Sequence, residues 1–232
     1  MITKIFCDIA EINLIKKFNK KKIVDGFATN PSLMRKAGAK NYLAYCKKIL
    51  KICKNKPISF EVFADDFSNM KYQAYKLNSL GKNVYVKIPV CNSKGKFSGK
   101  IIKLLNREKI KLNITAVYNA KQTKRILDCL DRKTNVIISI FVGRAGDVGK
   151  DPVPEIKKSI AMSKKFKNVK ILWASVREPY NYTHAKELKC DIITVPPAII
   201  EKIENFGKTF QILTIETITN FLVDSKKSNF KI

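Results

Sequence analysis

Short runs of β-branched and apolar residues alternate with amphipathic stretches along the whole chain of 232 residues. The runs have the length and β-branched content of buried strands, and the stretches between them carry apolar residues at helical spacing, as in Asp66–Leu80 and Lys121–Leu130. The pattern predicts eight strands, at Thr3–Asp8, Ile23–Phe27, Pro57–Val62, Val84–Ile88, Leu112–Val117, Asn135–Phe141, Val169–Ser175 and Asp191–Val195.

Local signals at helix ends support this division. Asn30-Pro31-Ser32 and Asp151-Pro152 are typical of helix starts, and Gly81 and Gly207 are typical of helix stops. Eight strand–helix units without a linker predict an α/β fold in which residues 1–232 form a single (β/α)8 TIM barrel.

Residues 208–232 are expected to add a C-terminal helix, at Phe210–Asp224, and a tail beyond the eighth unit. The alternative architecture is a doubly wound open sheet. No glycine-rich dinucleotide-binding motif follows the first strand, which favours the barrel.

The formal net charge of +27 has two explanations. One is a surface for nucleic acid or another polyanion. The other is a lysine-biased composition, because only six of the 46 basic residues are arginines and the lysines are spread over nearly every predicted helix. We favour the second explanation and regard nucleic acid as an unlikely partner. Either way, the positive charge would favour small anionic substrates.

The chain has no apolar run long enough to span a membrane and no pattern of a signal peptide after Met1, so a cytoplasmic location without a membrane partner is expected. The six cysteines form no CxxC motif and no cluster with zinc spacing. They are expected to be free thiols in a reducing compartment, and no metal site is predicted.

One lysine interrupts the most regular strand of the pattern, Val84–Val90. An ammonium group is costly to bury, so Lys87 needs a reason to stand there. A chemical reason is that a desolvated amine can attack a carbonyl and form a Schiff base. The structural alternative is an edge strand from which the lysine side chain extends to water.

In a barrel of this kind the functional groups gather where the strands end. Chemically capable residues fall at or just after the predicted carboxyl ends, namely Asp8, Asn30, Glu61, Lys87, Asn113, Thr115, Ser139, Phe141, Arg144, Ser175 and Arg177. Each has an ordinary explanation when taken alone: Asp8 could cap a helix, Asn113 and Thr115 could face solvent, and the arginines could be loop charges. Their convergence on one end of one barrel favours a shared site.

The set makes chemical sense as a site for a ketose phosphate. A lysine amine beside two carboxylates provides a nucleophile with proton carriers. Two arginines and a serine provide donors that suit a phosphate group.

The motifs also carry a resemblance to a known family. They are Asp25-Gly26-Phe27-Ala28-Thr29-Asn30-Pro31-Ser32-Leu33, Ile58-Ser59-Phe60-Glu61-Val62, Val86-Lys87-Ile88-Pro89, Leu112-Asn113-Ile114-Thr115-Ala116, Phe141-Val142-Gly143-Arg144 and Ala174-Ser175-Val176-Arg177. Their content and order resemble the transaldolase family, and the chain length resembles its short branch, which includes the fructose-6-phosphate aldolases.

The resemblance implies transfer of a dihydroxyacetone unit between sugar phosphates, within carbohydrate metabolism and the pentose phosphate pathway. Lys87 would form the Schiff base, and Asp8 would exchange the proton of the C4 hydroxyl. Glu61 would handle protons at the carbinolamine with a water held by Thr115. No cofactor would be needed.

The resemblance also assigns the residues that would hold the substrate. The three-carbon unit would be bound by Asn30, Asn113 and Ser139, with Phe141 lining the site. The phosphate would be bound by Arg144, Ser175 and Arg177. Short members of the family assemble through the terminal helix, so a homo-oligomer is expected.

Three other functions stay open. A lyase of the fructose-6-phosphate aldolase type would release free dihydroxyacetone; aldolases of the family tend to have Gln at the position of Glu61 and Tyr at that of Phe141, so both residues favour the transferase. A transaldolase-like enzyme of surface-sugar metabolism is the second. A basic polyanion-binding protein on a degenerate barrel is the third, and the presence of Asp8, Glu61 and Lys87 together speaks against it.

Overall fold

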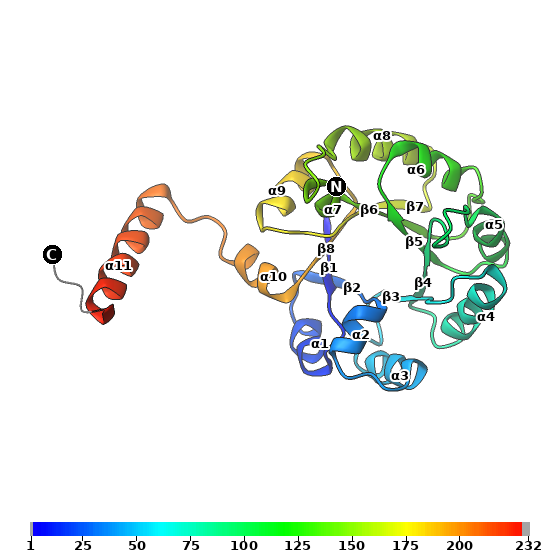
Figure 1. Ribbon diagram of the computed structural model, residues 1–232, viewed down its shortest axis with the longest axis horizontal. Coiled ribbons are helices and arrows are strands. Elements are labelled where there is room, and N and C mark those ends of the chain that lie inside the picture. The colour runs from blue at the N-terminus through cyan, green and yellow to red at the C-terminus, as the bar shows by residue number, and fades with distance from the viewer. Residues whose placement is uncertain (1, 229–232) are drawn as a thin grey trace.

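The computed structural model describes residues 2–228, and their strands form one closed parallel barrel. The strands follow one another around the barrel in chain order, and β8 pairs with β1 to close it. Figure 1 looks along this barrel and shows the helices as an outer ring. The strands are β1 (Lys4–Asp8), β2 (Val24–Ala28), β3 (Ile58–Glu61), β4 (Val84–Pro89), β5 (Leu112–Val117), β6 (Val136–Phe141), β7 (Val169–Ala174) and β8 (Ile192–Val195).

The predicted TIM barrel is therefore confirmed, and the open sheet is not formed. Each predicted strand coincides with an observed one to within one residue at either end. The helices are α1 (Ile12–Asn19), α2 (Pro31–Lys36), α3 (Tyr42–Ile52), α4 (Phe67–Asn78), α5 (Gly99–Arg107), α6 (Ala120–Leu127), α7 (Val142–Gly146), α8 (Val153–Ser163), α9 (Tyr180–Glu187), α10 (Pro197–Glu204) and α11 (Phe210–Ser228).

The helix-start motifs act as expected. The Asn30 side chain accepts a hydrogen bond from the Leu33 amide at 2.9 Å, and Pro31 opens α2 where its missing N–H costs nothing. Asp151 similarly accepts from the Val153 amide at the start of α8. Asp8 does not cap a helix, because α1 begins only at Ile12.

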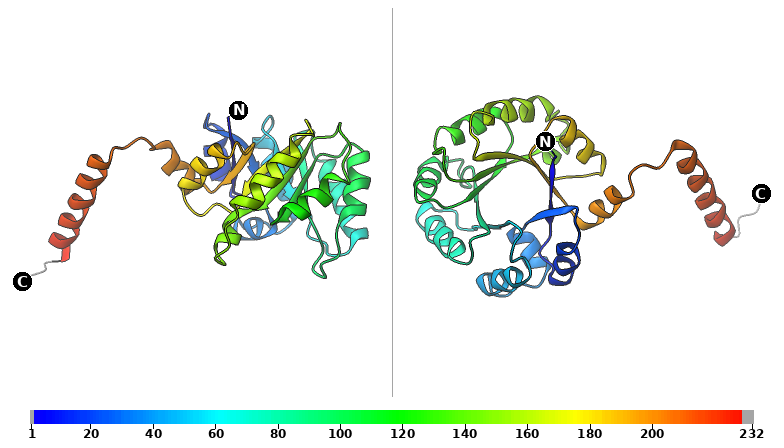
Figure 2. Two further views of the ribbon diagram at one scale, coloured as in Figure 1. Left: turned by 90° about the horizontal axis from the view of Figure 1, so that it is seen from above. Right: turned by 180° about the vertical axis from the view of Figure 1, so that it is seen from behind.

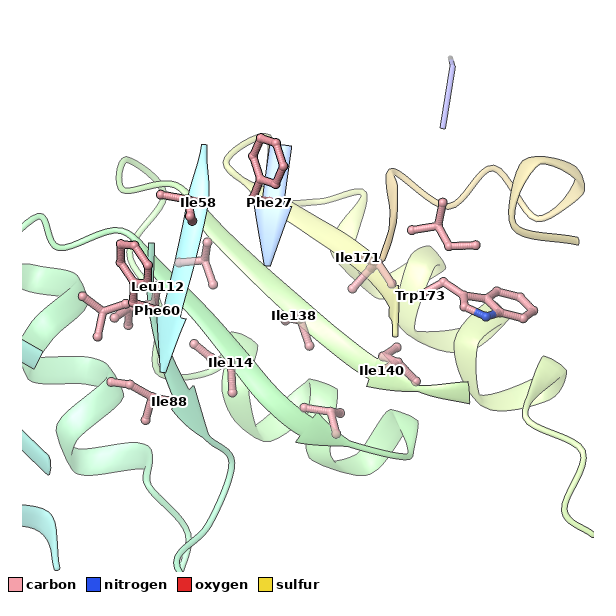
Figure 3. Packing of buried hydrophobic residues seen from close by; sticks show 14 of the residues in the cluster. Phe27, Ile58, Phe60, Ile88, Leu112, Ile114, Ile138, Ile140, Ile171 and Trp173 are labelled. Carbon is pink, nitrogen blue, oxygen red and sulfur yellow. The ribbon is translucent and has the colours of Figure 1, made fainter. Parts of the chain in front are cut away.

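Residues along each strand alternate between two apolar layers. Outward-facing residues such as Phe60, Ile88, Ile138 and Trp173 pack in one large cluster under the helices (Figure 3). A smaller cluster fills the inside of the barrel, formed by Phe6, Ile137, Leu172, Ala174 and Ile192, with Tyr85 and Phe141 packed against it. The inner cluster supports the polar side chains at the carboxyl ends of the strands.

The last helix, α11, stands away from the barrel in both views of Figure 2. It begins at Phe210 as predicted and continues four residues past Asp224, whereas the predicted tail beyond Ser228 lies outside the described residues. None of its residues is buried. Within residues 2–228, no helix combines the length and the hydropathy that crossing a bilayer requires.

Candidate active site

The predicted site residues converge on the carboxyl ends of the strands. Strand register places Glu61 beside Lys87, and Lys87 beside Asn113, so three neighbouring strands each direct one functional side chain into the barrel. A cavity of about 220 Å³ opens at this end. It is lined by Asp8, Asn30, Lys87, Asn113, Thr115, Ser139, Phe141, Arg144, Ser175 and Arg177, together with Ala28, Leu172, Ala174, Val176, Thr194 and Pro196. Glu61 lines an adjoining lobe that Lys87, Thr115 and Arg144 share.

Lys87 is buried, with 7% of its surface exposed. Its ammonium group does not lie in apolar surroundings, as its strand neighbours had suggested. Its Nζ lies 3.0 Å from Oε2 of Glu61 and donates a hydrogen bond to the Thr29 carbonyl at 3.2 Å. Pairing offsets the cost of burying the charge, and it puts a proton acceptor against the amine. The alternative of an edge-strand lysine reaching to water is wrong, because a closed barrel has no edge strand.

Asp8 ends β1 on the opposite side of the cavity mouth from β5. Burial raises the pKa of its carboxyl; the nearby Lys87 partly offsets this, and Glu61 adds to it. Within residues 2–228, the Asp8 side chain makes no hydrogen bond. A carboxyl with a raised pKa and free oxygens suits proton exchange with a ligand.

Asp8→Asn is expected to stabilise the fold while removing activity. The ionised carboxylate is disfavoured by burial, so native stability should be greatest below the unfolded pKa of about 4 and should fall as pH rises through the raised folded pKa. The amide removes this loss at neutral pH. Thermal unfolding between pH 4 and 8 measures the gain in stability, which should raise the Tm by about 2–4 °C for each kcal/mol. Asp224→Asn, at an exposed acid on α11, is the control, and a Tm that falls in Asp8→Asn would contradict the expectation.

A chain of side chains crosses the inside of the barrel from β6 to β3. Ser139 Oγ donates to Asn113 Oδ1 at 2.6 Å, and Asn113 Nδ2 donates to Ser59 Oγ at 2.9 Å. All three are buried. The chain fixes which way the Asn113 amide points, so one Nδ2 hydrogen stays available to a ligand. Ser59 was missed from the sequence. It lies two residues before Glu61 on the same strand and therefore points to the same side, which is the signal that could have identified it.

Two further polar residues have spare hydrogen-bonding capacity. Thr115 Oγ1 is buried and has no partner among the described residues, although it lines the cavity. A buried hydroxyl of this kind is normally satisfied by water or ligand. Asn30 uses its Oδ1 to cap α2, so only its amide nitrogen can serve a ligand.

The lining of the cavity also contains two arginines, Arg144 and Arg177. Arg144 lies on α7, with its guanidinium 5.3 Å from the centre of the Phe141 ring, and Ser175 and Arg177 lie on the loop after β7. Ser175 has a φ of 67°, which a non-glycine residue adopts only at a cost of order 1–3 kcal/mol. Gly143 permits this loop to approach, because a Cβ there would lie 1.6 Å from the Ser175 carbonyl oxygen.

Arg177 is not free in this structure. Its Nε donates to Oδ1 and Oδ2 of Asp147 at 2.9 and 3.2 Å, and its Nη2 donates to Oδ2. Asp147, which ends α7, was also missed from the sequence, where it looked like one more acid in a solvated loop. Among the described residues, no group of three or more His, Cys, Asp or Glu side chains could hold a metal ion.

At the carboxyl end of a (β/α)8 barrel, the site combines a lysine paired with a carboxylate and a set of amide, hydroxyl and guanidinium donors, which suits an enzyme site for a small polar anion. Comparison with known proteins makes this specific. Residues 5–232 match the family model described as Transaldolase/Fructose-6-phosphate aldolase, and the chain therefore belongs to that family of enzymes.

Individual relatives agree with this assignment. A "Probable transaldolase" of Nitrosopumilus maritimus is 35% identical over 227 residues, which cover 97% of this chain and 95% of the relative. Another of the same description, from Bdellovibrio bacteriovorus, is 34% identical and covers 98% of this chain and 100% of the relative. Among solved structures, KGPDC of Streptococcus mutans matches with a TM-score of 0.55 at 11% identity, covering 87% of this chain and 90% of that one; this likeness concerns the fold alone.

Proposed function

We propose that this enzyme transfers a dihydroxyacetone unit from a ketose phosphate to an aldose phosphate through a Schiff base on Lys87. The observation that carries the proposal is the buried Lys87 amine, 3.0 Å from the Glu61 carboxylate and at the edge of a cavity lined by Asp8. One nucleophile and two carboxylates are what the formation and breakdown of an imine need.

The proposed reaction begins with a proton transfer from the Lys87 ammonium to Glu61. The neutral amine attacks the C2 carbonyl, and loss of water from the carbinolamine gives the protonated imine. Asp8 then takes the proton of the C4 hydroxyl, and the C3–C4 bond breaks. Its electron pair moves into the imine to give an enamine, and the fragment that begins at C4 leaves as an aldose phosphate. The acceptor aldehyde adds at C3, and the same steps run in reverse.

The remaining donors would hold the substrate along the cavity. Asn113 and Ser139 reach the cavity from β5 and β6 in a fixed orientation, which suits the hydroxyls of the three-carbon unit. Asn30 offers its amide nitrogen. Arg144, Ser175 and Arg177 would bind the phosphate at the other end, where guanidinium groups can make charge-assisted hydrogen bonds.

Borohydride trapping tests this proposal. Fructose 6-phosphate and borohydride should add a reduced three-carbon unit to the enzyme, since hydride reduces the imine to a stable secondary amine. Peptide mapping should place it on Lys87, and erythrose 4-phosphate should lower the yield by accepting the unit. An adduct on another lysine, or none, would overturn the mechanism. Lys56 and Lys111 are the informative alternatives, because burial lowers the pKa of both amines.

A lyase that releases dihydroxyacetone uses the same first half-reaction, and a role in surface-sugar metabolism would change the substrates but not the site. We favour the transferase because Glu61 and Phe141 are the residues that the resemblance associates with transaldolases. Both line the lobe next to Lys87, where the enamine would form.

We also propose that the enzyme is a homo-oligomer in which α11 packs against another copy of the chain. Its apolar residues Ile215, Ile218 and Leu222 recur at helical spacing and are all at least half exposed. Ile218→Asp should therefore lower the molar mass measured by light scattering, because a charge in an apolar interface is strongly disfavoured. Asn220→Asp, at an exposed polar residue on the opposite side of the helix from Ile218, is the matched control; unchanged mass in both variants would contradict the role of α11.

A further inference from the structure

The loops after β6 and β7 are braced against each other beside the cavity. The backbone part of the brace is the close approach of Gly143 to the Ser175 carbonyl. The side-chain part is the ion pair of Asp147, at the end of α7, with Arg177. Arg177 lines the cavity, but Asp147 does not. The carboxylate therefore contacts the guanidinium without itself lining the cavity.

The hydrogen bonds of this pair use one particular edge of the guanidinium. A guanidinium group carries five N–H donors in a rigid planar fork. Asp147 accepts from Nε and from Nη2, which together form the side edge. Among the described residues, no group accepts from Nη1 or from the second hydrogen of Nη2. That hydrogen and the neighbouring hydrogen of Nη1 form the end edge, which can bind two oxygens of one phosphate.

Arg144, the other arginine of the site, is held differently. It has no ion-pair partner among the described residues and lies over the Phe141 ring. Arg177 is thus the arginine whose direction is set by a charged partner. About half of each side chain in the Asp147–Arg177 pair is exposed. An ion pair as exposed as this adds little to folding stability, so its effect should be on the direction of Arg177.

We propose that Asp147 is a positioning residue for the phosphate end of the substrate: it fixes the side edge of Arg177 so that the end edge faces the anion. The inference rests on the proposed function, because it assumes that Arg177 binds a phosphate. Without Asp147, a long half-exposed side chain would have to be ordered when substrate binds, and that ordering weakens the affinity.

A second effect of Asp147 acts in the opposite direction. Its negative charge repels the phosphate, so removal of the charge alone would strengthen binding. This repulsion passes through solvent and is screened by salt, with a Debye length of about 8 Å at 0.15 M. The Asp147–Arg177 ion pair is in direct hydrogen-bond contact, so salt weakens it less than it weakens the repulsion of the phosphate. At physiological salt and above, orientation should therefore dominate.

The experiment compares Asp147→Ala, Asp147→Asn and Asp147→Glu in the full-length enzyme at two salt concentrations. Asp147→Ala should raise the KM for fructose 6-phosphate and the competitive inhibition constant of inorganic phosphate by the same factor, roughly three- to tenfold. The kcat should change less than twofold. Asp147→Asn keeps one acceptor and should show a smaller effect, and Asp147→Glu should restore part of the affinity.

Three comparisons separate positioning from a structural role. Borohydride trapping of free dihydroxyacetone, which has no phosphate, should proceed at the wild-type rate in Asp147→Ala. In an Arg177→Ala background, Asp147→Ala should not weaken phosphate binding any further. Asp128→Asn, which removes an exposed acid paired with Lys124 at the end of α6, should leave all constants unchanged.

The proposal is overturned if KM falls or stays constant in Asp147→Ala, which would make Asp147 a repelling charge or a bystander. It is also overturned if dihydroxyacetone trapping slows as much as fructose 6-phosphate turnover, which would indicate a structural defect. If inorganic phosphate does not inhibit the wild type, the phosphate end itself is wrong and the inference fails with it. Absence of any lysine adduct in the wild type would instead overturn the proposed function.

Discussion

Replacing Lys87 with methionine should abolish both borohydride trapping and transfer of the three-carbon unit. No other buried amine takes the place of Nζ: among the described residues, Lys87 is the one lysine that lines the main cavity, and Lys36, which lines the adjoining lobe, is exposed. Without the imine there is no electron sink for cleavage of the C3–C4 bond. Removal of a covalent nucleophile in other enzymes costs roughly 10⁴- to 10⁶-fold in kcat, and we expect a loss of this order. Measurements with fructose 6-phosphate and erythrose 4-phosphate give the value.

The structure adds a consequence for stability that the strand pattern alone did not suggest. Methionine fills the volume of the lysine stem, but it leaves the Glu61 carboxylate without its partner. A partly buried carboxylate that loses its ion pair is destabilising, by roughly 1–3 kcal/mol. Glu61→Gln combined with Lys87→Met should recover most of this loss, because the amide carries no charge. Chemical denaturation of the single and the double variant measures both effects.

The control for this prediction is Lys111→Met. Lys111 precedes β5 at the other end of the barrel, and burial also lowers the pKa of its amine. This variant should keep full trapping and turnover. If Lys87→Met retains measurable transfer while its fold is intact by circular dichroism, the imine does not form on Lys87.

The barrel could be predicted from the sequence because its strands are buried on both sides. Each strand is a short β-branched run, and the stretches between them have helical spacing, so every local signal agrees with the same architecture. Helix ends follow less directly from the sequence. Gly81 and Gly207 follow α4 and α10 by three residues instead of ending them directly, because the turns after those helices use additional residues.

The position of the site could also be predicted, because it depends on where the strands end and on the alternation of side chains between the two faces of each strand. Lys87, Asn113 and Ser139 face the cavity for the same reason that Val86 and Ile114 face the helices. The pairings between these groups could not be predicted. They depend on distances across the barrel, such as 3.0 Å from Lys87 to Glu61, which sequence spacing does not contain.

Two contributors were missed for different physical reasons. Ser59 is a small polar residue in an apolar run, and nothing in its sequence context distinguishes it from a strand residue that packs passively. Asp147 is one acid in a loop, and its importance arises only when the β7 loop brings Arg177 to it. The direction in which a long side chain such as that of Arg177 points is set by tertiary contacts, which the local sequence does not contain.

The second large effect concerns the fate of the enamine on Lys87. An acceptor aldehyde completes the transfer, whereas protonation and hydrolysis release free dihydroxyacetone. A transferase must keep the second route slow. Glu61→Gln with Phe141→Tyr should raise the release of dihydroxyacetone from fructose 6-phosphate relative to its transfer to erythrose 4-phosphate, by ~10²–10⁴-fold in the ratio of the two rates.

The geometry explains why two positions are needed. Glu61 lies 3.0 Å from Lys87 Nζ, so it competes for the water and protons that imine hydrolysis requires. The amide of glutamine keeps an acceptor but cannot hold a proton in the same way. Phe141 lines both lobes beside Lys87, and its ring offers no donor there. A tyrosine hydroxyl at this position could protonate the enamine at C3.

Because both changes act on one intermediate, their effects should not add. The single variants and the double variant form a cycle, and we expect the double to exceed the product of the single effects on the release rate. Coupled-enzyme assays of free dihydroxyacetone, with and without erythrose 4-phosphate, measure the ratio. A wild type that already releases dihydroxyacetone as fast as it transfers it would make the enzyme a lyase, and our preference for the transferase would be wrong. If only the wild type transfers efficiently, the Glu61 carboxylate and the hydroxyl-free ring of Phe141 together account for the slow hydrolysis.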